Sequence, residues 1–129
     1  MADWKKWDLR GLKVTQLRYD YQFHIHMWTL HRDFLVTFGA PFILYSKKGI
    51  EQHFDPEKTE TLGPLLNLLF QPVTSFAASS EGFCTLEFEK GEQLRGEPHE
   101  KYEAWESRGS EDLEEATLLC DAGGGSPWG

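Results

Sequence analysis

The sequence predicts a mainly β domain: two three-stranded meanders packed as a small sandwich or a partly open barrel, with one central helix and a C-terminal hairpin. Short segments in which apolar and polar residues alternate, separated by glycine-containing turns, predict the strands. A loose repeat predicts the two meanders, because Val14-Thr15 recurs as Val73-Thr74 and Gly39-Ala40-Pro41 recurs as Gly96-Glu97-Pro98. The expected organisation is a single domain, 1–129, with an internal repeat at approximately 12–45 and 71–98.

The first half holds four strand-like segments: 14–19, 22–29, 33–38 and 42–45. Alternation is clearest in the second segment, where every second residue of Phe23–Met27 is apolar and His24 and His26 point to the other side. The last two segments are expected to form one long strand with a bend or bulge at Gly39-Ala40-Pro41, because proline cannot donate to a β-ladder. Lys47-Lys48-Gly49 then predicts a turn.

One helix is predicted at approximately 57–70, with Asp55 as the candidate N-cap and Thr59 as a rival cap. Its apolar positions follow a helical stripe at Leu62, Leu65, Leu66 and Leu69. An interior proline would break the helix, so the regular part is expected over 61–70 with Gly63-Pro64 in its first turn.

The second meander is predicted from strands at 73–78, 83–89 and 92–96, with turns at 79–82 and 90–91. Beyond it, 102–107 and 116–120 predict a last hairpin around Gly109–Asp112. Glutamates at every third position from Glu97 to Glu106 make a short helix after Pro98 the alternative, so 98–107 is either helix or strand. The glycine-rich segment 121–129 is expected to be a mobile tail.

Charge is uneven along the chain. The formal net charge is −8, and residues 1–71 contribute +1 whereas residues 72–129 contribute −9. Phosphate backbones are bound by arrays of Lys and Arg, so the second half is unsuited to nucleic acid. An acidic surface attracts a basic partner, although acidic surfaces also serve solubility alone.

Cysteine use and hydropathy indicate a cytoplasmic protein. Cys84 and Cys120 are too few for a disulfide framework, and both lie among apolar neighbours. No apolar run follows the first residues as in a secretory signal, and no segment approaches the ~18 apolar residues of a membrane span. We therefore expect no membrane association.

Three histidines are weak candidates for a metal site. His24 and His26 share one face of a predicted strand, and His31 follows shortly after. Zinc takes at least three protein ligands, and the chain has no complete ligand motif. The alternative is a pair of imidazoles on the solvent face of a half-exposed sheet, so we expect no metal and no cofactor.

Signals for catalysis and nucleic-acid binding are weak. The chain lacks a Gly-x-Ser-x-Gly elbow and a phosphate-binding loop, and neither cysteine has a basic neighbour in sequence. Basic and aromatic residues interleave from Trp4 to Tyr19, but the acidic residues among them and the net charge oppose a stacking platform. We expect no catalytic residues and no nucleic-acid partner.

An acidic and aromatic segment is the candidate partner-binding site. It comprises Glu100, Tyr102, Glu103, Trp105 and Glu106. Tyr and Trp anchor interfaces, and surrounding glutamates speed association with a basic protein. Because aromatic residues dominate cores as well, Tyr102 and Trp105 belong either to an interface or to the core.

The chain resembles a small uncharacterised bacterial domain family. The residues that carry the resemblance are Gly11, Leu12, Val14 and Thr15 at the front, then Pro98, Tyr102–Glu106, Leu118–Cys120 and the Gly-Gly before Trp128. Family members are similar in size and acidity to the immunity proteins that neutralise polymorphic toxins, and the resemblance implies no catalytic residues. This chain departs from the family pattern at 107–115, where a longer acidic insertion replaces a tight turn.

These observations together predict a non-enzymatic, cytoplasmic protein-binding module, in its specific form an immunity-type inhibitor of a basic toxin. A small-ligand or metal-binding domain that uses His24, His26 and the space between the sheets is one alternative. A homo-oligomeric structural module, assembled through an exposed strand edge, is another.

Overall fold

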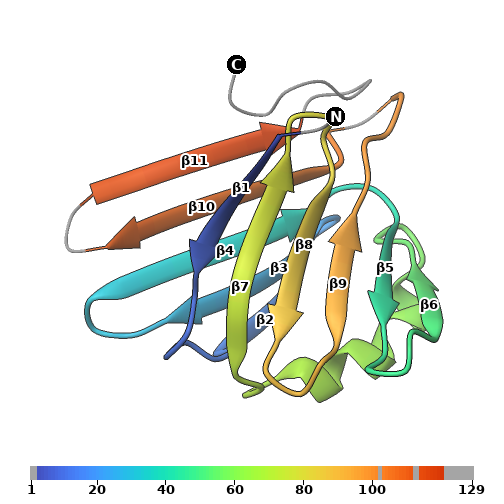
Figure 1. Ribbon diagram of the computed structural model, residues 1–129. Helices are drawn as coiled ribbons and strands as arrows, with labels where there is room; N and C mark the ends of the chain where they lie inside the picture. The colour runs from blue at the N-terminus through green and yellow to red at the C-terminus, as the bar shows by residue number, and fades with distance from the viewer. Residues whose placement is uncertain (1–2, 102, 112–113, 121–129) are drawn as a thin grey trace.

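Two antiparallel sheets face each other in the computed structural model, which describes residues 3–101, 103–111 and 114–120 (Figure 1). The six-stranded sheet has the order β1 (Trp4–Asp8), β7 (Val73–Ser79), β8 (Cys84–Phe88), β9 (Gln93–Gly96), β5 (Phe42–Tyr45) and β6 (Glu51–Phe54). The five-stranded sheet has the order β11 (Glu114–Cys120), β10 (Trp105–Glu111), β4 (Arg32–Phe38), β3 (Phe23–Trp28) and β2 (Gln16–Tyr19). The predicted mainly β fold is confirmed.

Each sheet is built around one meander. Strands β2, β3 and β4 are neighbours in one sheet, and β7, β8 and β9 are neighbours in the other. The two turns of the second meander use the expected residues, because Gly82 and Gly91 adopt φ of 93° and 102°, a backbone conformation that glycine tolerates best. Strands β1 and β6, which extend the six-stranded sheet, were not expected from the sequence.

The prediction of one long strand from Asp33 to Tyr45 is wrong. Its two halves are β4 and β5, which belong to different sheets: Phe38 pairs with Trp105, whereas Phe42 pairs with Gly96. The chain crosses between the sheets at 39–41, where the Gly39 N–H donates to the Ala104 carbonyl at 3.0 Å. Proline at position 41 cannot continue the ladder, so the break becomes a crossing.

The predicted α-helix is replaced by two 3₁₀ segments, η1 (Thr59–Thr61) and η2 (Gly63–Leu68). At three residues per turn, i and i+3 share one side, so Leu62, Leu65 and Leu68 are buried while Leu66 is exposed. The Asp55 carboxylate accepts the Glu57 N–H at 2.9 Å, which places this cap before the first 3₁₀ turn. The prediction failed because an α-helical stripe and a 3₁₀ stripe share their first two positions.

The C-terminal hairpin is present with a shifted turn. Strands β10 and β11 pair over seven residues each, so Gly109–Glu111 lie inside β10 instead of in the turn. Strand structure is adopted at 105–107, and the described residues between Pro98 and Ala104 form no helix. The expected tail at 121–129 lies outside the described residues.

Aromatic side chains from both sheets form the core between them. Ring pairs cross the interface at Phe34–Phe76, Phe38–Phe42 and Phe76–Trp105, with centroids 4.4–5.8 Å apart. Gly96 makes room for this packing, since a Cβ there would lie 2.7 Å from Cys84 Sγ and 2.9 Å from the Phe38 ring. Close packing of this kind fills the space between the sheets, where a small-ligand site was one expectation.

Candidate functional site

His24 is held between two side chains on the outer face of the five-stranded sheet. Its Nε2–H donates to Asp20 at 2.5 Å, and its Nδ1 lies 2.9 Å from the Thr37 hydroxyl. The hydrogen bond from His24 lowers the pKa of Asp20 below its ordinary value of 3.8, and the charges of His24 and Arg18 add to this effect. His24 is only 7% exposed, and these two contacts give both of its ring nitrogens a partner within the protein.

The other two histidines do not complete a metal site. His26 shares the outer face with His24, as predicted, but its Nε2 lies 2.7 Å from the Asp33 carboxylate. His31 is exposed after the end of β3. Within the part of the chain that the structure describes, no group of three or more His, Cys, Asp or Glu side chains could hold a metal ion. Each strand histidine is instead paired with its own carboxylate.

The chain Asp20–His24–Thr37 has the connectivity of a catalytic triad, with carboxylate, imidazole and hydroxyl in sequence. A nucleophile must also reach its substrate, and Thr37 is only 8% exposed. Its position near the end of β4, opposite His24 and Glu106, places it on a sheet face instead of in a cleft. The arrangement therefore orients side chains on the sheet without an accessible reacting atom.

The acidic connection, residues 97–104 between β9 and β10, carries two of the predicted site residues at the surface. Glu100 and Glu103 are exposed. Glu106 lies beyond it in β10, half-buried, and its carboxylate accepts a hydrogen bond from Arg108 at 3.1 Å. Glu100 and Glu103 therefore carry the charge that a partner could meet.

Of the two aromatic residues in the predicted site, Trp105 is not at the surface alongside the glutamates. Trp105 lies in the core at 1% exposure, and its indole N–H donates to the Gly82 carbonyl at 2.8 Å. Its side chain consequently offers no surface to a partner. Tyr102 lies outside the described residues.

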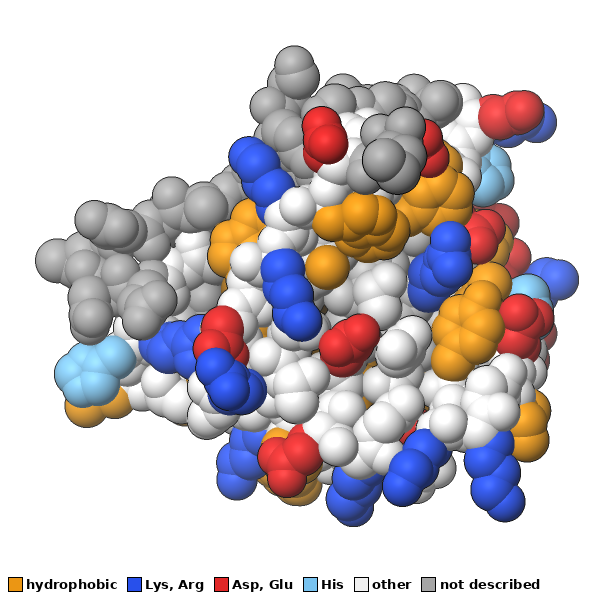
Figure 2. All heavy atoms as spheres, viewed as in Figure 1, with side chains coloured by type: hydrophobic (Ala, Val, Ile, Leu, Met, Phe, Trp, Pro, Cys, Tyr) orange, Lys and Arg blue, Asp and Glu red, His pale blue; other side chains and the backbone are white. Residues whose placement is uncertain are grey.

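Charges of both signs cover the six-stranded sheet. Figure 2 shows Lys and Arg side chains interspersed with Asp and Glu over this face, without a broad area of one sign. The acidic surplus of the sequence is therefore not spread over this sheet. The exposed glutamates of the acidic connection, Glu97, Glu100 and Glu103, belong to that surplus.

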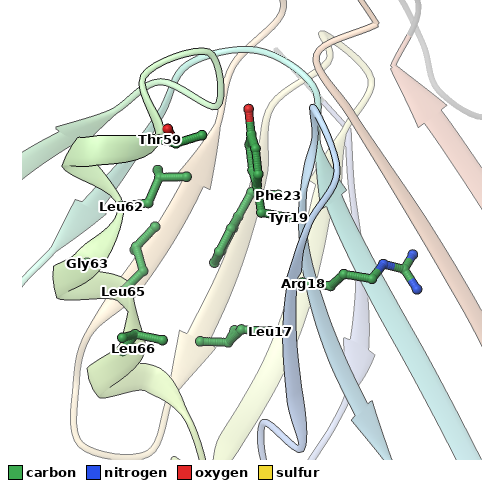
Figure 3. A pocket seen from close by; sticks show the side chains of 9 residues that line it. All are labelled: Leu17, Arg18, Tyr19, Phe23, Thr59, Leu62, Gly63, Leu65 and Leu66. Carbon is green, nitrogen blue, oxygen red and sulfur yellow. The ribbon is translucent and has the colours of Figure 1, made fainter.

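An apolar cleft between β2 and the 3₁₀ segments was not predicted from the sequence. Its volume is about 280 Å³. In Figure 3, the side chains of Leu17 and Phe23 lean toward η2, the Tyr19 ring runs along the cleft to the level of Thr59, and Arg18 points away. The lining residues are Leu17, Arg18, Tyr19, Phe23, Thr59, Leu62, Gly63, Leu65 and Leu66. The 3₁₀ geometry leaves Leu66 at the rim, 67% exposed.

This fold and these surfaces define a small β-sandwich domain with an apolar cleft at one open strand edge. The chain belongs to DUF6188, a family of unknown function, whose model matches residues 5–128. No curated protein and no solved structure matches the chain. Over the described residues, no helix is both long enough and apolar enough to cross a membrane.

Proposed function

We propose that the protein is a non-enzymatic, cytoplasmic binding module for another protein, in its specific form an immunity-type inhibitor of a basic toxin. The observation that carries the proposal is the exposure of Glu100 and Glu103 on the acidic connection. Carboxylates that keep their charge at the surface attract and orient a basic partner. A chain that carries −9 in residues 72–129 adds to that attraction over long range.

The mode of inhibition that follows is occlusion. An acidic inhibitor that covers the basic surface of a nuclease denies that surface to phosphates, which bind through the same Lys and Arg side chains. Trp105 is not an anchor in this scheme because it is a core residue. Association is expected to depend strongly on salt, since the interaction of exposed charges more than about 10 Å apart is largely screened at 0.1 M.

The test is a charge-reversal pair with a matched control. E100K/E103K changes the net charge by the same amount as E57K/E60K, which alters two exposed glutamates at and just before η1. A basic partner recovered at low salt from the native host should lose affinity for E100K/E103K and keep it for E57K/E60K. Equal affinity for the two variants would show that the acidic connection does not form the interface.

A small-ligand role is the second candidate, and the apolar cleft is the observation that favours it. The cleft has nearly twice the volume of an engineered cavity of about 150 Å³ that binds benzene. An apolar molecule that fills it should raise the melting temperature of the protein, by an amount that grows with the logarithm of ligand concentration once the site is nearly saturated. This role would use the cleft beside β2, away from His24 and His26.

A further inference from the structure

Among the described residues, no strand pairs with the outer edge of β2, so its hydrogen-bonding groups are left unused by the sheet. Strand β2 is the last strand of its sheet, and the Asp20 N–H closes the β2–β3 turn by donating to the Gln22 carbonyl at 3.1 Å. Because antiparallel pairs alternate, the peptide groups of Arg18 and Gln16 then face β3. Those of Leu17 and Tyr19 face outward, along the open edge.

The same two residues line the cleft. Leu17 directs its side chain toward the leucines of the facing segment, and the Tyr19 ring runs along the same cleft with its hydroxyl at the level of Thr59 (Figure 3). A strand added beside β2 would have the same alternation, so every second side chain would enter the cleft. We propose that this edge accepts an extended peptide segment of a partner protein as an added strand, with its alternate apolar side chains filling the cleft.

The chemistry of the segment follows from the two faces of β2. On the cleft side, the lining is almost entirely apolar, so the entering side chains are apolar. On the other side, Arg18 forms an ion pair with Asp20 at 3.8 Å, which is too long for a hydrogen bond, and its side chain stays 54% exposed. Opposite charges on neighbouring strands stabilise pairing, so the residue beside Arg18 is acidic. Three consecutive residues of the segment are therefore expected to be apolar, acidic and apolar.

The cleft favours a segment of chain over a second copy of the protein. The 3₁₀ segment η2 borders the cleft on the side facing β2 (Figure 3), so a folded sandwich approaching this edge would meet η2 first. The volume of about 280 Å³ suits one or two side chains. Main-chain hydrogen bonds would supply affinity and the cleft would supply selectivity, as in other cases of strand addition.

The experiment selects peptides from a displayed library of random 12-residue sequences on the immobilised full-length protein. The proposal predicts enriched sequences with an apolar–acidic–apolar pattern. L66E places a charge at the rim of the cleft and should weaken the selected peptide at least tenfold. I50E, at an apolar residue of similar exposure (64%) in another turn, should leave its affinity unchanged.

Gly63→Leu gives a second blocking variant that keeps the fold. A Cβ at Gly63, which lines the cleft, meets no atom within 4 Å, so the backbone position accepts a side chain without a clash at its first atom. It should weaken the peptide while leaving the melting temperature at or above that of the original protein. Hydrogen exchange should show the amides of Leu17 and Tyr19 becoming protected when the peptide is bound.

Several results would overturn the inference. They are the absence of peptides enriched over the L66E protein, binding without protection of those amides, and concentration-dependent dimerisation that competes for the edge. The inference draws on the proposed function only in that the partner is a protein. E100K/E103K leaves the cleft intact, so its affinity for the peptide should not change. The proposals for the acidic connection and for the β2 edge can therefore be refuted independently.

Discussion

Replacing Trp105 provides the sharpest check on the packing of β10 against the six-stranded sheet. W105A should destabilise the protein by about 3–5 kcal/mol, because it removes a large buried ring and leaves a cavity between the sheets. For a domain of this size, that corresponds to a fall in melting temperature of about 10–20 °C. W105F keeps a ring against Phe76 but loses the indole donor to Gly82, so we expect about 1–3 kcal/mol.

Urea unfolding followed by circular dichroism measures both values. If the slope of the unfolding free energy against urea concentration is unchanged, the substitution has not altered the denatured state. W28A is the matched control, because Trp28 is 51% exposed and its loss should cost less than about 0.5 kcal/mol. If W105A and W28A destabilise equally little, Trp105 is not a core residue and β10 is misplaced.

Three further outcomes are expected. G96A should destabilise the protein by about 1–3 kcal/mol, because its Cβ would meet packed core atoms. G63A should leave stability unchanged or raise it by up to about 1 kcal/mol. Calorimetry that ranks the two variants in the opposite order would contradict the packing described. D20N should destabilise at pH 7, and the difference from the original protein should shrink as the pH falls below 3.8, because a carboxyl with a lowered folded pKa loses its contribution when it is protonated. A difference that stays constant between pH 7 and pH 2, measured beside the E57Q control, would argue against the pairing with His24. Prolonged dialysis against EDTA should leave the melting temperature unchanged, and a fall reversed by zinc would reveal a metal site.

Local patterns in the sequence predicted the meanders, whereas contacts between distant segments could not be predicted. Alternation in Phe23–Met27 determines which face of β3 is buried, and that information lies within five residues. The crossing at 39–41 depends on Trp105 and Gly96 pairing with opposite sides of the break, more than fifty residues away. A proline in a strand signals an interruption, but only the pairing partners decide that the chain changes sheet.

In the candidate site, too, local patterns were predictable from the sequence and contacts between distant residues were not. Alternation places His24 and His26 on one face, while their carboxylate partners follow from the turn after β2 and from the register of β4. Exposure of Glu100 and Glu103 was expected from composition, whereas burial of Trp105 required knowledge of its neighbours. The cleft depends on η2 being a 3₁₀ segment, and the leucine spacing alone did not distinguish it from an α-helix.

The pairing of β4 with β10 also determines when the protein can fold during synthesis. All seven residues of β4 pair with β10, which lies more than sixty residues later in the chain. The nascent chain therefore holds β4 without its neighbouring strand, and Phe76 without the Trp105 ring, until β10 has left the ribosome. Exposed apolar strands of this kind aggregate, so this domain should depend on chaperones during translation and refold slowly from denaturant.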